Sequence, residues 1–65
     1  MTTIIRKAGG WEFIKDSFMG VTAFYNSELN IQSNWNTGND AVEEIVKVEK
    51  MTDSEFKEYA DKSIQ

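Results

Sequence analysis

Two residue types on which much protein chemistry depends are missing from this chain. Its 65 residues include no cysteine and no histidine. Without cysteine no disulfide can form, and without either residue a zinc ion lacks its preferred sulfur and nitrogen ligands. The commonest general base and the strongest nucleophile of enzymes are absent as well. The chain therefore has to gain its stability from packing or from association, and we expect no zinc site.

Long apolar runs are also missing. The uninterrupted apolar segments are only a few residues long, whereas a membrane-spanning helix needs about 18 or more such residues. No apolar stretch of the kind found in secretory signals follows the basic pair Arg6 and Lys7. We therefore expect a cytoplasmic protein that is not inserted in a membrane.

The small size limits the core that the chain can bury. A chain of 65 residues forms one domain and buries only about 60% of the surface of its unfolded form. Its composition, 40% hydrophobic and 28% charged residues, is ordinary for a globular protein. We expect a single folded domain over residues 1–65, with little stability to spare.

Most of the first two thirds of the sequence has the pattern of β-strands. Residues 20–26 are rich in β-branched and aromatic types, and residues 28–36 alternate between apolar and polar side chains. Gly9 and Gly10 suit the tight turn of a hairpin, because glycine accepts the positive φ values that such turns require. The predicted strands are residues 2–8, 11–16, 20–26 and 28–36.

The segment 42–49 fits two structures. Its β-branched residues, with Val46 and Val48 alternating with charged neighbours, favour a fifth strand. Asp40 and Glu43 have the spacing of a helix-start capping box, which supports a helix instead. We favour the strand and keep the helix as the alternative.

The end of the chain has the signals of a helix. Thr52 and Glu55 have the spacing of a capping box, and Met51 and Phe56 that of a hydrophobic staple. The residues that follow form one apolar stripe, which needs a surface to pack on. We predict a helix over residues 53–63. The expected fold is α+β: a small antiparallel sheet of four or five strands, a meander or partly rolled, with one C-terminal amphipathic helix packed on it.

No motif for catalysis or for a cofactor is present. The acidic residues of the C-terminal part are interspersed with lysines, as on a solvated surface, and the serines have no triad partners. The glycine pair lacks the context of a phosphate-binding loop. Residues 34–40 resemble a calcium loop only in their spaced oxygen-bearing side chains, since the early carboxylates are missing. We expect no catalytic residue, no metal and no cofactor.

Charge and aromatic content point to a protein partner. The formal charge is −4, and residues 38–65 carry eight acidic and four basic residues, which argues against direct binding to nucleic acid. Because one helix cannot cover both faces of a sheet, some aromatic side chains are expected to meet another chain. The predicted contact residues are three aromatic residues and three acidic neighbours: Trp11, Tyr25, Trp35, Glu43, Glu44 and Glu49.

Size and composition are similar to those of small accessory proteins of bacteriophages and mobile elements that bind and block a host protein. No motif carries this similarity. The leading interpretation is a non-enzymatic protein, a homodimer, that inhibits or sequesters a host protein. The alternative is a protein that binds an anionic metabolite or a nucleotide in a dimer cleft, with Arg6 or Lys7 contacting the anionic group. An enzyme that works through carboxylates ranks last.

Overall fold

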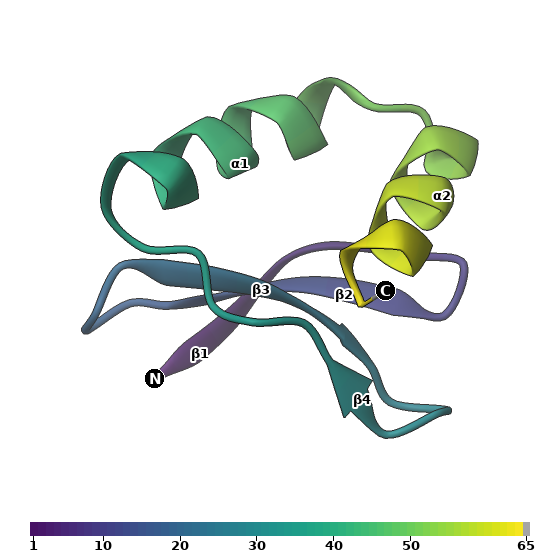
Figure 1. The fold of residues 1–65 in the computed structure, drawn as a ribbon, viewed down its shortest axis with the longest axis horizontal. Coiled ribbons are helices and arrows are strands. Elements are labelled where there is room, and N and C mark those ends of the chain that lie inside the picture. The colour runs from purple at the N-terminus through teal and green to yellow at the C-terminus, as the bar shows by residue number, and fades with distance from the viewer. Residues whose placement is uncertain (65) are drawn as a thin grey trace.

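The computed structural model describes residues 1–64 as one antiparallel sheet with two helices (Figure 1). The strands are hydrogen-bonded in chain order, β1-β2-β3-β4, which is a meander. Both helices lie on the same side of the sheet. These features confirm the predicted α+β fold class. The elements are β1 (Thr2–Ala8), β2 (Trp11–Asp16), β3 (Val21–Asn26), β4 (Ile31–Gln32), α1 (Gly38–Lys50) and α2 (Asp53–Ser63).

The first hairpin turns at the glycine pair, as the sequence predicts. Gly9 and Gly10 have φ angles of 58° and 82°, which only glycine adopts without steric cost. A Cβ atom at Gly9 would also lie within 3.2 Å of the Lys57 side chain. The turn brings Ala8 opposite Trp11 and sets the register of the first two strands.

The sheet register separates two faces. Arg6, Phe13 and Phe24 occupy one row across β1, β2 and β3 on the face that the helices cover. A bulge between Ile4 and Arg6 shifts the register of β1. Ile4 is thereby paired with Ile14 in the row of the opposite face, which has no helix on it (Figure 1).

The segment predicted as a fifth strand is a helix, so the favoured interpretation of residues 42–49 is wrong. Ala41 and Val48 are buried against the sheet, with Ile45 partly buried between them. Spacings of four and three residues put these side chains on one helical face. The weak β-preference of single residues is overridden by burial of this face. The helix begins at Gly38, after Thr37, rather than at Asp40.

The fourth strand is much shorter than predicted. β4 pairs only two residues with β3, and beyond it a single bridge joins Asn36 to Thr22. Residues 27–30 form a turn instead, in which the Asn26 side chain accepts a hydrogen bond from the Leu29 amide at 3.1 Å. Asn30 has a φ angle of 53°, a conformation that asparagine tolerates better than most residues. Local turn chemistry therefore ends the strand that the alternating pattern predicted.

The last helix begins and ends where the sequence predicts. The Thr52 hydroxyl accepts a hydrogen bond from the Glu55 amide at 3.2 Å, and the Thr52 amide donates to the Glu55 carboxylate at 2.8 Å. These bonds to Thr52 hold the pKa of Glu55 below its usual value. Met51 packs against the core cluster that contains Phe56. The capping box and the hydrophobic staple are both confirmed.

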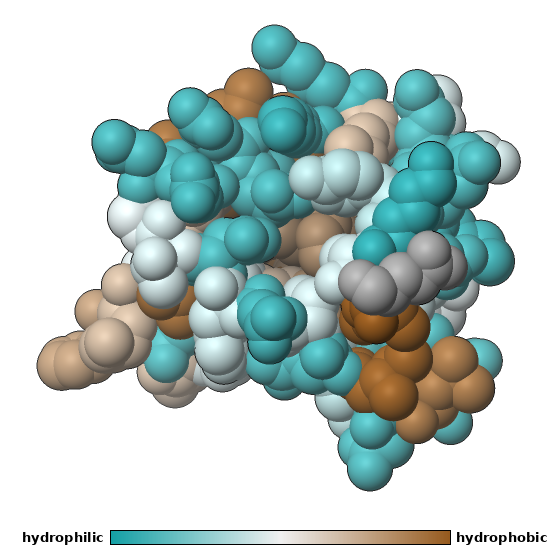
Figure 2. All heavy atoms as spheres, in the orientation of Figure 1, coloured by the Kyte–Doolittle hydropathy of each residue, from teal (hydrophilic) through white to brown (hydrophobic). Residues whose placement is uncertain are grey.

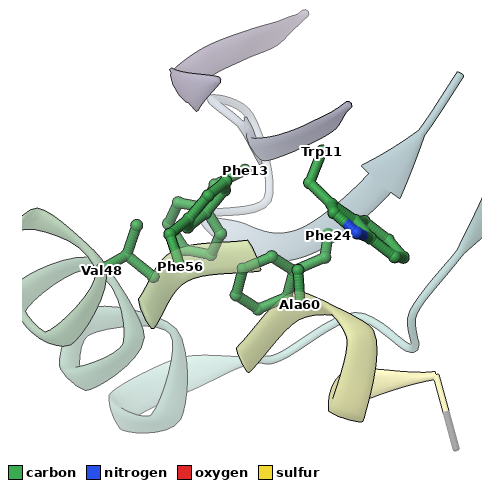
Figure 3. Packing of buried hydrophobic residues seen from close by; sticks show 6 residues of the cluster. All are labelled: Trp11, Phe13, Phe24, Val48, Phe56 and Ala60. Carbon is green, nitrogen blue, oxygen red and sulfur yellow. The ribbon is translucent and has the colours of Figure 1, made fainter. Parts of the chain in front are cut away.

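Aromatic rings form the core between the sheet and the helices. Side chains from β2, β3 and both helices point toward one another there (Figure 3). The Phe24 ring lies at its centre, with centroid distances of 5.0 Å to Phe13, 5.7 Å to Phe56 and 5.6 Å to Tyr59. Rings at such separations attract one another beyond the effect of area burial. Among residues 1–64, neither helix has the length and apolar character needed to cross a membrane.

Candidate functional site

A cavity of about 300 Å³ opens between α1, α2 and the segment that follows β4. Figure 2 shows a hollow near the middle of the view, between the two helices, with apolar atoms inside it and mostly hydrophilic atoms around it. Its volume is at the lower end of the range found for small-molecule sites. The lining residues are Phe24, Ser33, Asn34, Asn36, Glu44, Tyr59, Lys62 and Ser63.

Backbone pairing holds one wall of this cavity in place. The Phe24 amide donates a hydrogen bond to the Ser33 hydroxyl at 2.9 Å, and Thr22 exchanges two backbone hydrogen bonds with Asn36. This pairing fixes the segment between β4 and α1 along β3, although most of that segment is not a strand. The backbone of Ser33 also donates to the Phe24 carbonyl at 2.9 Å. The polar side chains of this wall are therefore held by the sheet.

The two helices supply the charged groups of the cavity. Glu44 comes from α1, while Tyr59, Lys62 and Ser63 come from α2 at spacings of three and four residues, which place them on one helical face. The Oε1 atom of Glu44 is buried and has no hydrogen-bond partner among residues 1–64. A buried carboxylate oxygen without a donor is energetically unfavourable. The cavity thus contains an acceptor that an occupant could satisfy.

Tyr59 has a changed acidity in this setting. Burial, and then the neighbouring Glu44 carboxylate, raise the pKa of Tyr59 to about 12. Both causes act in the same direction, because each disfavours a negative charge on the phenolic oxygen. The hydroxyl of Tyr59 is therefore neutral throughout the physiological pH range.

Titration of Tyr59 is expected to weaken the fold at high pH. A folded-state pKa above the unfolded value means that the full stabilisation is present below about pH 10 and is lost as the pH rises toward about 12. Ultraviolet absorbance of a Tyr25→Phe variant would follow Tyr59 alone, and urea midpoints at several pH values would follow the stability. A Tyr59 midpoint at or below pH 10 would contradict this prediction.

The three predicted aromatic contact residues lie in different environments. Trp11 is only 2% exposed and belongs to the core, so it has almost no surface to offer a partner. Tyr25 is half-buried on the helix-free face of the sheet, opposite Glu12. Trp35 is 42% exposed in the segment between β4 and α1. The structure therefore does not bring the three rings together on one surface.

The buried Trp11 instead ties the sheet to α2. Its indole nitrogen donates a hydrogen bond to Asp61 at 2.9 Å, and the other oxygen of Asp61 lies 3.0 Å from the Lys57 ammonium. Lys57, followed by Trp11, holds the pKa of Asp61 below its usual value. The polar end of the indole is thus satisfied without a partner molecule.

The three predicted acidic residues are also separated. Glu43 and Glu49 are exposed on α1, whereas Glu44 lines the cavity. The cavity itself was missed in the sequence, because its walls come from three separate parts of the chain. The regular spacing of Tyr59, Lys62 and Ser63 was the only local signal of it.

The outer side of α1 carries exposed apolar residues. Val42 and Val46 are 61% and 48% exposed and lie four residues apart, one above the other on the helix. By helical periodicity, Glu43 and Glu49 lie on either side of this pair. Figure 2 shows apolar atoms at the edge of α1 among hydrophilic ones. We call these four residues the α1 stripe. The remaining exposed large apolar residues are Met1, Ile4, Phe18, Met19, Leu29, Trp35 and Ile64.

The two basic residues considered for an anionic ligand have partners within the chain. The Arg6 guanidinium donates to the Val48 carbonyl and lies 2.9 Å from Asp53. The Lys7 ammonium lies 3.7 Å from Glu12 and remains mostly exposed. Arg6 is thus part of the structure that joins β1 to both helices.

The comparisons with known proteins supply no relative. No family model, curated protein or solved structure matches this chain. Among residues 1–64, no three carboxylate side chains come together in a way that could hold a metal ion. Function therefore has to be inferred from the cavity, from the α1 stripe and from the charges around them.

Proposed function

We propose that this chain is a non-enzymatic protein-binding module that contacts its partner through the α1 stripe. The observation that carries the proposal is the exposure of Val42 and Val46 in the middle of a helix whose other side is packed on the sheet. Neighbouring apolar side chains on an outer helical face are typical of helices that dock on another protein.

The charges around the stripe indicate the chemistry of the partner. Glu43 and Glu49 flank the two valines, and the whole excess of negative charge lies in residues 38–65. An apolar surface bordered by lysine or arginine residues would complement this arrangement, and opposite charges would speed the encounter. The proposed partner is therefore a different protein with a basic rim around an apolar centre.

Trp35 extends the proposed surface. It lies two residues before the cap of α1 and is partly exposed, and tryptophan is among the residues that contribute most to binding energy at interfaces. Replacement of Trp35 by alanine is expected to weaken partner binding strongly while the fold is kept. Inhibition of a host protein in the cytoplasm, and a homodimeric state, remain predictions from size and composition.

The α1 stripe can be tested by capture from a bacterial lysate with matched variants. A Val42→Ser/Val46→Ser variant removes the apolar centre, and a Glu43→Lys/Glu49→Lys variant reverses the flanking charges. Phe18→Ser is the control, since Phe18 is 87% exposed in the turn between β2 and β3. We expect one protein to be retained by the unchanged chain and by the control and to be lost with both stripe variants.

Two results would overturn this function. One is capture of the same proteins by all variants, or of none by the unchanged chain. The other is a two-copy mass in light scattering that falls to one copy in the valine variant, because a second copy of this chain would then occupy the stripe. Binding that weakens as salt is raised would support the role of the flanking acids.

A further inference from the structure

We propose that the cavity between α1 and α2 binds a small zwitterion with an apolar body, the chemistry of a free amino acid. Its ammonium group would lie against Glu44 and its carboxylate would be directed to Lys62. This site is separate from the α1 stripe, because Glu44 lies on the side of α1 that packs over the sheet.

The first step of the argument is the acceptor inside the cavity. The Oε1 atom of Glu44 is buried, and no group of residues 1–64 donates a hydrogen bond to it. An ionised carboxylate in such a place is best satisfied by a charged donor, since charge-assisted hydrogen bonds are about twice as strong as neutral ones. A primary ammonium supplies three donors in a compact group.

The second step is the cation on the facing helix. Lys62 also lines the cavity and has no carboxylate of residues 1–64 within 4.0 Å. A ligand that carried only positive charge would be repelled by this ammonium, and one that carried only negative charge would be repelled by Glu44. A ligand with one charge of each sign complements both residues.

The third step concerns the size and the floor of the cavity. A volume of about 300 Å³ accommodates a molecule of amino-acid size but not a nucleotide with its full shell of phosphates. Phe24 and Tyr59 contribute aromatic surface, while Ser33, Asn34 and Asn36 contribute polar groups at the wall. An apolar side chain on the ligand would contact the rings, as in other small-molecule sites.

Binding can be measured by amide chemical shifts of the ¹⁵N-labelled chain during titration with L-leucine and L-phenylalanine. We expect shifts confined to residues 33–36, 44 and 59–63, with a dissociation constant of about 0.1–1 mM for at least one of the two, as is usual for a ligand of so few atoms. N-acetyl-L-leucine lacks the ammonium and L-leucine methyl ester lacks the carboxylate. Each is expected to bind at least about tenfold more weakly than leucine.

A pair of variants separates this site from general surface binding. Glu44→Gln is expected to weaken leucine or phenylalanine binding by about tenfold or more, because it removes the charge of the acceptor. Glu43→Gln, the neighbouring exposed change on α1, is expected to leave binding unchanged. Absence of shifts with both amino acids at tens of millimolar would overturn the proposal. So would equal binding of leucine and its N-acetyl derivative, a result that does not depend on the folding of any variant.

Discussion

Replacement of Phe24 by alanine is expected to leave the protein largely unfolded at room temperature. The Phe24 side chain is 1% exposed and lies at ring-packing distance from Phe13, Phe56 and Tyr59. Truncation of a buried phenylalanine to alanine costs about 3–5 kcal/mol, from lost burial and from the cavity that remains. No other single ring of the chain touches elements from both layers in this way.

The size of the chain makes this cost decisive. A domain of 65 residues has a stability of about 3–10 kcal/mol at the usual value per residue. The substitution therefore removes most of the free energy of unfolding, or all of it. Far-ultraviolet circular dichroism and the fluorescence of the buried Trp11, followed through a urea titration, would measure the loss.

The matched control is Phe18→Ala, which makes the same chemical change at an exposed position. Phe18 lies in the turn between β2 and β3 and is almost fully exposed. Surface substitutions of this kind usually change stability by less than about 0.5 kcal/mol. Equal urea midpoints for the two alanine variants would show that the Phe24 ring is not the centre of the core.

The parts of the fold that could be predicted from the sequence are those with local signals. Gly9 and Gly10 specify a tight turn, and the strands on either side have the predicted bounds. Thr52 and Glu55 determine the start of α2 through hydrogen bonds between residues close in sequence. Such signals need no knowledge of distant contacts.

The start of α1 could not be found in this way. The Thr37 side chain makes no capping hydrogen bond, and Gly38 has a positive φ angle of 57°. The helix exists because Ala41 and Val48 bury one of its sides on the sheet. Its exposed Val42 and Val46 gave the sequence a misleading resemblance to a strand. A tertiary cause of this kind is not visible in a local pattern.

The candidate site was harder still to predict. Ser33, Glu44 and Lys62 come from three elements, and only the folded chain brings them around one cavity. Trp11 was assigned to an interface because tryptophan is common there, yet Asp61 accepts its indole hydrogen bond within the chain. Whether a ring is buried depends on which helices cover it, and the second helix was not expected.

Loss of the Arg6 side chain is expected to be the second most damaging change that we consider. Its guanidinium donates to the Val48 carbonyl in the last turn of α1, lies 2.9 Å from Asp53 at the start of α2, and sits 5.2 Å from the centre of the Phe56 ring. One side chain of β1 thus joins the sheet to both helices. An Arg6→Ala variant is expected to lose about 2–4 kcal/mol of stability, because it removes charged hydrogen bonds, a cation–π contact and packing together.

Three further variants divide this loss among its causes. Lys7→Ala is the neighbouring control, and Lys7 makes only an exposed contact with Glu12, so its removal is expected to cost less than about 1 kcal/mol. Asp53→Asn removes only the exposed partner of Arg6 and is expected to be similarly mild. Arg6→Lys keeps the charge but loses the planar fork of donors, so its stability is expected to lie between those of the alanine variant and the unchanged chain.

Urea unfolding of these variants would distinguish a structural arginine from a surface one. If Arg6→Ala is no more destabilising than Asp53→Asn, the arginine acts only through an exposed ion pair, and its contacts with Val48 and Phe56 contribute nothing. The larger loss that we expect would mean that the junction of α1 and α2 is held from below by β1. Arg6 would then be unavailable to an anionic ligand, because the charge that such a ligand needs already stabilises the end of one helix and the start of the next.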